Sequence, residues 1–232
     1  MTVAPAEFTP IGDSAVLVSF ADAISDTAHA QVVALDRALG SDPPAGMTET
    51  VPALVNLLVA FDVTETDHAD ISAHIRGLLP GLQAQGIAGA QQRVPICYEG
   101  DCAPDLAAVA DATGLSPEAV IAAHLEGDYR VLMYGFAPGY AYMAGVPAAI
   151  QVPRKPAPVR DVPAGSVIIA GPQCLVTTLK MPTGWSIIGR SPARILRDDP
   201  DKPFLFDVGD HIRFERIDLA THHRLSAEAE HG

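Results

Sequence analysis

Basic residues are scarce in this sequence, where 15 lysines and arginines stand against 28 acidic residues and give a formal net charge of −13. Proteins that bind nucleic acids usually present a broad basic face, so this excess of acid argues against a nucleic acid partner. Long apolar runs are missing as well. The best one, residues 51–61, is interrupted by Pro52 and Asn56 and falls short of the roughly 20 apolar residues that a membrane span requires. We therefore expect no membrane segment.

Cysteine is also rare. The three cysteines, Cys97, Cys102 and Cys174, form an odd set that suits neither a disulfide framework nor a zinc site. The N-terminal residues have neither a basic start nor an apolar core, so they do not resemble a secretory signal. These features predict a cytoplasmic protein without a metal site, in which Cys174 is a buried and inert thiol.

The common nucleotide-binding and hydrolase motifs are absent from the sequence. It contains neither the phosphate loop, G-x-x-x-x-G-K followed by serine or threonine, nor G-x-G-x-x-G, nor the G-x-S-x-G elbow. Ser166 lies at a turn that enters a predicted strand, which does not match the strand-to-helix position of a hydrolase nucleophile. His124 could act as a general base, but its place near the end of a predicted helix favours a structural role.

The first 88 residues predict a compact α/β domain. Apolar runs at 15–20 and 54–61 are typical of buried strands. Apolar residues recur with helical spacing over 24–39, and Asp67 is placed to cap a second helix. This order predicts helices packed on one sheet. Residues 83–92, which carry little charge and few large side chains, are the expected linker.

Residues 89–220 predict a small antiparallel β-barrel. Pro95 indicates that its first strand lies near an edge. Gly114 is expected to end one helix, and Ser116 with Pro117 to begin the next. Residues 221–232 lack apolar periodicity, so we expect a disordered tail there. The expected strands are 93–98, 129–134, 166–170, 175–179, 185–190 and 211–216.

The stretch 133–192 holds most of the unusual features of the chain. Nine of its residues are prolines and seven are glycines, so turns interrupt it throughout. Aromatic residues gather at its start, and Trp185, the single tryptophan, lies near its end. Between residues 131 and 197, seven basic residues accompany one acid, Asp161. This combination suggests a concave site for a small anion, such as a carboxylate or phosphate; the alternative is a basic sheet face that pairs with the protein's own acids.

Three segments of this stretch resemble a known family. Their sequences are GFAPGYAYMAGVP at 135–147, PRKPAPVRDVPAGSVIIAG at 153–171 and GWSIIGRSP at 184–192. They are similar to the signature of the 5-oxoprolinase B subunit family, which also includes the Kip kinase inhibitor, allophanate hydrolase subunit 1 and half of the carboxyltransferase domain of urea carboxylase. The resemblance extends over nearly all of residues 11–217. It implies an α+β protein in which an N-terminal α/β sandwich-like domain precedes a cyclophilin-like antiparallel β-barrel domain.

The resemblance also implies a function. In the 5-oxoprolinase system, the B subunit acts with a C subunit and a third subunit, and ATP hydrolysis, expected to need Mg²⁺, drives opening of 5-oxo-L-proline to L-glutamate. This chain would then be an enzyme subunit that binds no cofactor alone. The other members leave two alternatives open: a carboxyltransferase subunit of the allophanate hydrolase or urea carboxylase type, and a Kip-like inhibitor of a sensor histidine kinase. Peptidyl-prolyl isomerase activity, by analogy with cyclophilins, has less support because a fold does not carry a function.

The site residues that we expect are cations, rings and one amide from this stretch. We expect them to converge on one hollow that binds a small anionic substrate and that the C subunit covers. Phe136 would help to wall the hollow, although the barrel core is the favoured alternative for it. The expected catalytic residues are Arg160, Gln173 and Arg190. The expected substrate-binding residues are Tyr140, Tyr142, Arg154, Lys180 and Trp185.

One segment departs from the family pattern. Relatives usually carry AGxQTGIYP followed by SPGGW, whereas this chain has AGPQCLVTTLKMPTGW at 170–185 and so keeps Gln173 and Trp185. The replacement at 175–177 indicates a different substrate if the segment lines the pocket. It could equally be a harmless repacking of a strand.

Overall fold

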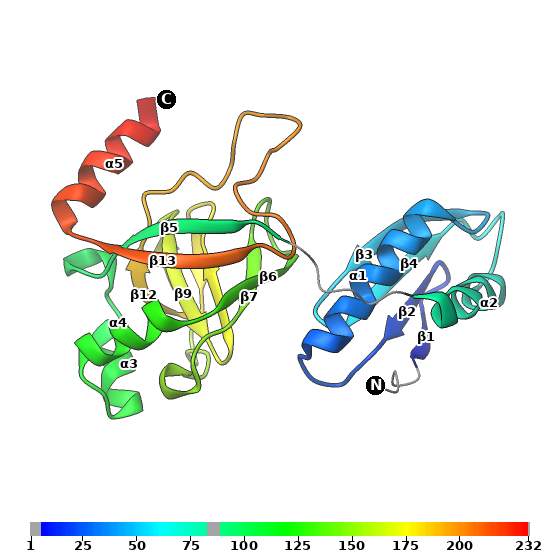
Figure 1. Cartoon of the computed structure of the whole chain (residues 1–232), viewed down its shortest axis with the longest axis horizontal. Helices are drawn as coiled ribbons and strands as arrows, with labels where there is room; N and C mark the ends of the chain where they lie inside the picture. Colours follow the sequence, from blue (N-terminus) through cyan, green and yellow to red (C-terminus); the bar gives the residue numbers. More distant parts are fainter. Residues whose placement is uncertain (1–5, 83–88, 232) are drawn as a thin grey trace. The chain divides into compact units, whose positions relative to one another are not determined.

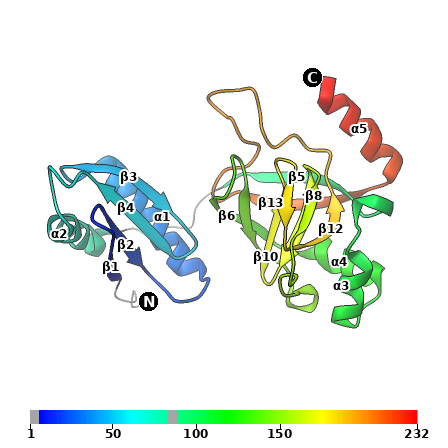
Figure 2. The ribbon, with the colours of Figure 1, turned by 180° about the vertical axis from the view of Figure 1, so that it is seen from behind.

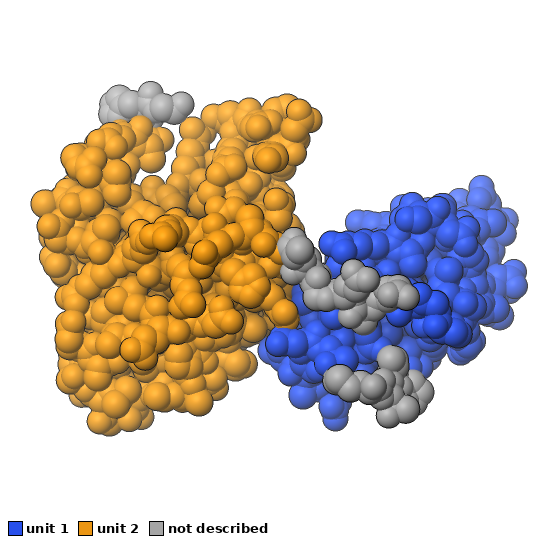
Figure 3. All heavy atoms as spheres, in the orientation of Figure 1, with its two compact units in different colours: residues 1–87 blue, residues 88–232 orange. Residues whose placement is uncertain are grey.

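The computed structural model describes residues 6–82 and 89–231 and divides the chain into two units, residues 1–87 and 88–232 (Figure 3). Each unit has its own hydrophobic core. The sequence placed this division after residue 88. Of the expected linker, residues 83–88 lie outside the described part of the chain, whereas Gln91 and Gln92 already belong to a strand.

In its described part, residues 6–82, the first unit is a four-stranded antiparallel sheet with two α-helices (Figure 1). Leu35 and Ile71, one from each helix, share a core with Leu57 of the sheet, so both helices pack on the same sheet. The strands, in the order β1-β2-β4-β3, are Glu7–Ile11, Ala15–Ser19, Asn56–Phe61 and Met47–Pro52. The helices are α1 (Asp26–Ser41), α2 (His68–Leu78) and the 3-10 turn η1 (Leu79–Gly81).

The two central strands and both α-helices of this unit were predicted, and their capping residues explain the helix boundaries. Ser25 accepts the amide of Ala28 at the start of α1, and Asp67 accepts the amides of Ala69 and Asp70 at the start of α2. The outer strands β1 and β3 were not predicted. Neither strand has a buried residue and each contains a proline, so both lack the apolar pattern of a buried strand.

Within residues 89–231, the strands close into a barrel in the order β10-β7-β6-β13-β5-β12-β9 (Figures 1 and 2). The expected barrel is confirmed, but one pair differs from the antiparallel prediction because β13 runs parallel to β5. These two strands are the first and last of the barrel in sequence, so no tight turn forces them to be antiparallel. In sequence order the barrel strands β5, β6, β7, β9, β10, β12 and β13 are Gln91–Cys97, Tyr129–Tyr134, Ala141–Ala144, Ser166–Ala170, Gln173–Val176, Ser186–Arg190 and His211–Ile217.

The prediction that Pro95 marks an edge strand is wrong, because β5 lies between β13 and β12 in the closed barrel. Pro95 lies opposite Glu215 of β13, and toward β12 the strand pairs only through Cys97 and Arg190. A residue without an N–H is tolerated at this position because the β12 side of β5 is unpaired beside it.

Shorter elements surround the barrel. β7 and the separate two-stranded sheet of β8 (Val159–Val162) and β11 (Met181–Thr183) were not predicted, since they are short and lie among prolines and glycines. β10 ends at Val176, earlier than the expected strand 175–179, because the chain there leaves the barrel toward β11. The helical elements are η2 (Gly100–Cys102), α3 (Leu106–Thr113), α4 (Pro117–Glu126), η3 (Ala148–Ile150) and α5 (Leu219–His231).

Helices α3 and α4 begin and end near the residues that the sequence indicated. Gly114, with a φ of 70°, ends α3, and Ser116 accepts the amide of Ala119 at the start of α4. Among the described residues, no single helix is long and apolar enough to cross a membrane. Together α3 and α4 reach that length and composition, but the pair is bent by 92°.

The prediction of a disordered tail at 221–232 is wrong for residues 221–231, which belong to α5. The Leu219 amide donates to the Glu99 carboxylate at 3.3 Å, and the Thr221 amide donates to Asp218 at 2.7 Å. Both contacts satisfy amides that are otherwise free at a helix start. His222 of this helix is buried, and a search for apolar periodicity does not detect a buried histidine.

Candidate functional site

Several barrel strands are buried on both faces, and their residues alternate between two clusters. In β9, Val167 and Ile169 belong to the barrel interior, whereas Ile168 belongs to a second cluster on the outside, which β8 and β11 cover through Val162 and Met181. We call this second cluster the outer barrel face. Its buried members are Tyr140, Val162, Ile168, Ala170, Leu175, Met181, Trp185 and Ile187.

A row of aromatic rings runs over the outer barrel face, and we call Phe136, Tyr140, Tyr142 and Trp185 the aromatic row. Neighbouring ring centroids along the row lie 5.4, 5.7 and 6.1 Å apart. The guanidinium carbon of Arg154 lies 5.5 Å from the centroid of the Trp185 ring. These spacings favour edge-to-face ring contacts and a cation–π contact, which hold the row in place.

The exposure of these rings reverses what we expected. Phe136, for which the barrel core was favoured, is 74% exposed and has a φ of 70°, a left-handed conformation that a bulky residue rarely adopts. Tyr140, which we expected to bind substrate, is only 5% exposed, and burial raises the pKa of its hydroxyl to about 12. Tyr142 is half-buried. The row therefore runs from an exposed ring at Phe136 to a buried one at Trp185.

Two cationic side chains lie on or next to β8 and β11, the strands that cover the outer barrel face. Arg160 and Lys180 line a hollow of about 490 Å³ together with Met181, which is also a member of the outer barrel face. Lys180 is paired with Asp161 at 2.8 Å, but both side chains are mostly exposed. Such a surface pair is worth less than about 1 kcal/mol, so an incoming anion can compete for Lys180. Asp161 has a φ of 58°, so the backbone is strained beside these charges.

Two residues that the sequence analysis did not select hold Arg154 in place. The Lys155 ammonium donates to the Asp105 carboxylate at 2.5 Å, and the Lys155 amide donates to the carbonyl of Gly184 at 2.7 Å. The same carboxylate oxygen accepts the amide of Ile187 at 2.7 Å. These bonds fix the segment that carries Arg154 next to Trp185. The adjacent basic residues at 154–155 were the only hint of this ion pair in the sequence. Asp105, the partner of Lys155, lies 50 residues away.

Gln173 lies at the edge of the outer barrel face. It begins β10 opposite Ala170, and it shares the alternation of Leu175, which is in this face, rather than that of Cys174, which is inside the barrel. Its side chain is half-buried. Gln173 therefore joins Tyr140, Tyr142, Arg154, Arg160, Lys180 and Trp185 on one side of the barrel.

The expectation that all eight residues converge on one hollow needs correction, because only Arg160 and Lys180 line the hollow described above and Arg190 lies elsewhere. It ends β12, opposite Ser166 and Cys97, and its Nη2 donates to the backbone carbonyl of Asp101 at 3.4 Å. It lines a different hollow from Arg160. The pairing of β12 with β9 shifts between Ile187 and Gly189, so the direction of Arg190 does not follow from the regular alternation.

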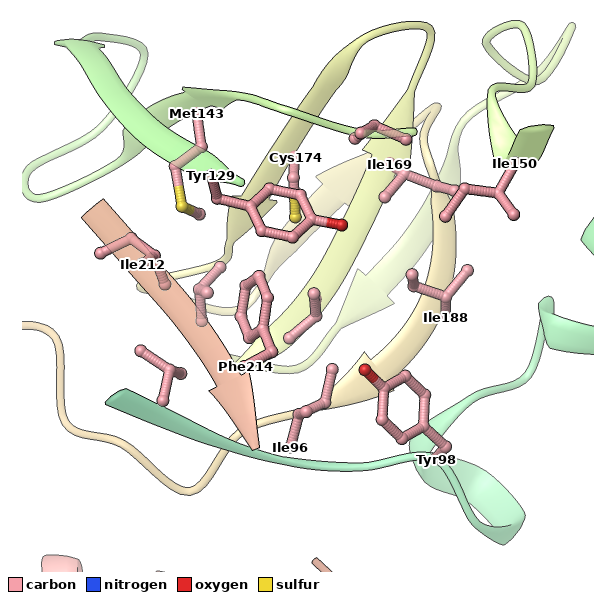
Figure 4. Close-up of a cluster of buried hydrophobic side chains, with 14 of the residues drawn as sticks. Ile96, Tyr98, Tyr129, Met143, Ile150, Ile169, Cys174, Ile188, Ile212 and Phe214 are labelled. Atoms are coloured by element: carbon pink, nitrogen blue, oxygen red, sulfur yellow. The ribbon is translucent and has the colours of Figure 1, made fainter. Parts of the chain in front are cut away.

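His124 and Cys174 are inside the barrel and belong to its structure. His124 is fully buried, its Nδ1 lies 2.7 Å from the Tyr98 hydroxyl, and its Nε2 lies 3.8 Å from the Cys174 sulfur. Burial lowers the pKa of His124 to about 3 and raises that of Cys174. Figure 4 shows Tyr98 and Cys174 among the apolar side chains of the interior. In residues 6–82 and 89–231, no group of three or more histidine, cysteine or acidic side chains is placed to hold a metal ion.

Comparison with known proteins identifies the family. The carboxyltransferase domain family, subdomains C and D, matches residues 6–206. The chain is 34% identical to the 5-oxoprolinase B subunit of Bacillus subtilis over 230 residues, which cover 94% of this chain and 96% of that one. The chain belongs to the 5-oxoprolinase B subunit family. The 5-oxoprolinase B subunit of Escherichia coli O157:H7 is 31% identical over 204 residues, or 88% of this chain and 93% of that protein.

Solved structures agree with this family. The crystal structure of TTHA0988 is 34% identical with a TM-score of 0.74; the match covers 88% of this chain and only 40% of that longer one. The urea carboxylase of Kluyveromyces lactis superposes on 98% of this chain with a TM-score of 0.82. That match covers 23% of the carboxylase at 15% identity, so it indicates a shared fold alone.

The segment that departs from the family pattern is part of the packed barrel. Leu175, Val176 and Thr177 are all buried. The Thr177 hydroxyl accepts the amide of Ser166 at 2.9 Å and donates to the carbonyl of Pro163 at 2.8 Å. The replaced residues 175–177 are therefore buried, whereas Lys180, Met181 and Pro182, later in the same segment, line the hollow at Arg160.

Proposed function

We propose that this chain is the B subunit of an ATP-dependent 5-oxoprolinase, which opens 5-oxo-L-proline to L-glutamate together with a protein like the 5-oxoprolinase C subunit and a third subunit. The observation that carries the proposal is the 34% identity to a protein named as a 5-oxoprolinase B subunit over nearly the full length of both chains. The position of the expected residues on one side of the barrel supports it. We further propose that the protein works in the cytoplasm, where its three buried cysteines would stay as free thiols.

The proposed reaction requires positive charge near the substrate, and side chains of this protein would supply it. A lactam is a stable amide, and phosphorylation of its oxygen makes the ring carbon open to attack by water. ATP, with Mg²⁺, supplies that phosphoryl group in the assembled complex. Arg160 and Lys180 would hold the phosphoryl or carboxylate oxygens, Arg154 with the aromatic row would wall the ring, and Gln173 would orient the amide.

The exposure of the cations explains why this chain would need a partner. Charges in contact with bulk water interact weakly because the dielectric constant is high. When the C-type partner covers the hollow at Arg160, water leaves and the same charges act more strongly on the substrate. Phe136, the exposed end of the aromatic row, would be placed for a contact with that partner. The chain alone should therefore be inactive.

A turnover assay with matched mixtures tests the proposal. ADP release and glutamate formation from 5-oxoproline would be measured for this chain alone, for the other two proteins alone and for all three together. We expect turnover only in the complete mixture. Full activity of this chain alone, or no turnover in the complete mixture, would contradict the proposal. In the second case, carboxyl transfer with a biotin carboxylase partner and inhibition of histidine kinase autophosphorylation would be assayed as the two alternatives.

A further inference from the structure

A second hollow, of about 460 Å³, lies between α5 and the end of β12. Its size falls in the range of roughly 300–1,000 Å³ that is usual for small-molecule sites. Figure 1 shows α5 (red) continuing from the end of β13. None of its lining residues belongs to the outer barrel face. Its polar lining comes from Asp101, Cys102, Arg190, His222, His223 and Ser226.

Arg190 has a hydrogen-bond donor in this hollow that has no partner among the described residues. Within the described residues it makes no ion pair, its buried Nε has no hydrogen-bond partner, and its Nη2 makes only the long bond to the backbone of Asp101. Arg194 provides a contrast, because it is paired with Asp198 at 2.5 Å. A buried donor without a partner destabilises the folded protein, because it has lost its hydrogen bonds to water. An acceptor that enters the hollow would remove this effect.

His222 is the second under-satisfied group. It is 6% exposed, and neither of its ring nitrogens has a hydrogen-bond partner in the described part of the chain. Burial, followed by the charges of Arg190 and His223, lowers the pKa of His222. The acid that lines the hollow, Asp101, has an exposed side chain, and Glu99 is engaged at the first turn of α5. No carboxylate therefore neutralises the hollow among the contacts that the structure describes.

The thiol in the hollow does not offer an alternative chemistry. Burial, with a further contribution from Cys97, raises the pKa of Cys102 to about 11. A nucleophilic cysteine needs a lowered pKa, so Cys102 is a neutral wall of the hollow at physiological pH. The hollow therefore offers the guanidinium of Arg190 and two histidine rings, and not a reactive thiol.

We propose that this hollow binds a small anion, a carboxylate or a phosphate group, between the guanidinium of Arg190 and the ring of His222. The planar fork of an arginine matches both kinds of group. A protonated His222 adds a second charge-assisted bond from a buried position, where such bonds are strong. This gives Arg190 a role apart from the outer barrel face. The proposal does not depend on 5-oxoprolinase activity, because the hollow belongs to this chain alone.

The test uses the full chain without any partner protein. Inorganic phosphate and L-glutamate serve as probes of the two anion types, at constant ionic strength, with calorimetry for affinity and NMR for the His222 ring. We expect at least one probe to bind in the millimolar range or tighter, to raise the apparent pKa of His222, and to bind more weakly as the pH rises. Arg190→Gln should weaken this binding at least tenfold, and so should His222→Gln. Arg194→Gln, which removes an equal charge outside the hollow, should leave it unchanged.

Each outcome of these binding measurements either supports the anion site or contradicts it. Binding of phosphate alone, of glutamate alone or of both, with loss in Arg190→Gln and His222→Gln, supports the site and identifies its ligand class. If neither probe moves the His222 signal, or if Arg190→Gln and Arg194→Gln bind equally well, the proposal is wrong. Thermal melting of each variant shows whether a loss of binding reflects unfolding, and His222→Gln provides the answer if Arg190→Gln does not fold.

Discussion

Replacing Arg160 with methionine should lower kcat of the assembled enzyme by roughly a hundredfold, with a smaller change in KM. The reason is that Arg160 is exposed and lines a hollow with Lys180. In the proposed complex a partner would cover this hollow, and the charge would act on oxygens that become more negative in the transition state. Methionine keeps the aliphatic length but removes the charge. The measurement is steady-state turnover of 5-oxoproline by the complete mixture.

Arg93→Met is the matched control for this prediction. Arg93 is an exposed arginine of the same unit, paired with Glu215 of the neighbouring strand at 2.7 Å, and it lines neither hollow. It should change kcat by less than about twofold, because an exposed pair contributes little. Equal losses in both variants would point to a general charge effect, and full activity of Arg160→Met would remove Arg160 from the proposed site.

Lowering the pH from about 7.5 to about 4.5 should destabilise the barrel unit by on the order of 3 kcal/mol through His124 alone. Burial lowers the folded-state pKa of His124 from its model-compound value of 6.5 to about 3. Below pH 6.5, His124 therefore binds a proton in the unfolded chain but not in the folded barrel. Stability from this group is complete above pH 6.5 and is lost by roughly 1.4 kcal/mol per unit as the pH falls toward 3.

Urea unfolding followed by fluorescence measures this effect, because Trp185, the chain's single tryptophan, lies in the barrel unit. His124→Gln should be less stable than the wild type at neutral pH, since its contacts with Tyr98 and Cys174 change, but it should lose much less stability on acidification. His74→Gln, in the other unit, should keep the wild-type slope. Identical pH slopes for the wild type and His124→Gln would contradict a buried neutral histidine.

The parts of the fold that the sequence predicted are those set by local chemistry. Asp67 and Ser116 were identified as caps and do accept the first amides of their helices. Ser25 was not identified, and the apolar spacing alone placed α1. Buried strands such as β9 gave a clear signal because both of their faces are apolar. Exposed strands such as β1 gave no such signal, because a face that contacts water does not require apolar residues.

The parts that could not be predicted depend on contacts between distant residues. The pairing of Asp105 with Lys155 joins residues 50 positions apart, and no local pattern marks it. The direction of Arg190 depends on a shift in strand pairing next to Gly189, and the helix α5 depends on Glu99, which lies 120 positions before Leu219. Residue types in the stretch 133–192 thus indicated a cationic, aromatic site, but only tertiary structure separates its cations into two hollows.

Hydrogen exchange of this chain, alone and mixed with the C-type partner, tests most directly whether the outer barrel face is the working surface. The backbone at 135–140, 155–161 and 177–185 should exchange more slowly in the mixture, while the backbone of α3 and α4 should exchange as before. Protection confined to α3 and α4, or an unchanged pattern at 135–140 and 177–185 in a complex that turns over 5-oxoproline, would contradict this account.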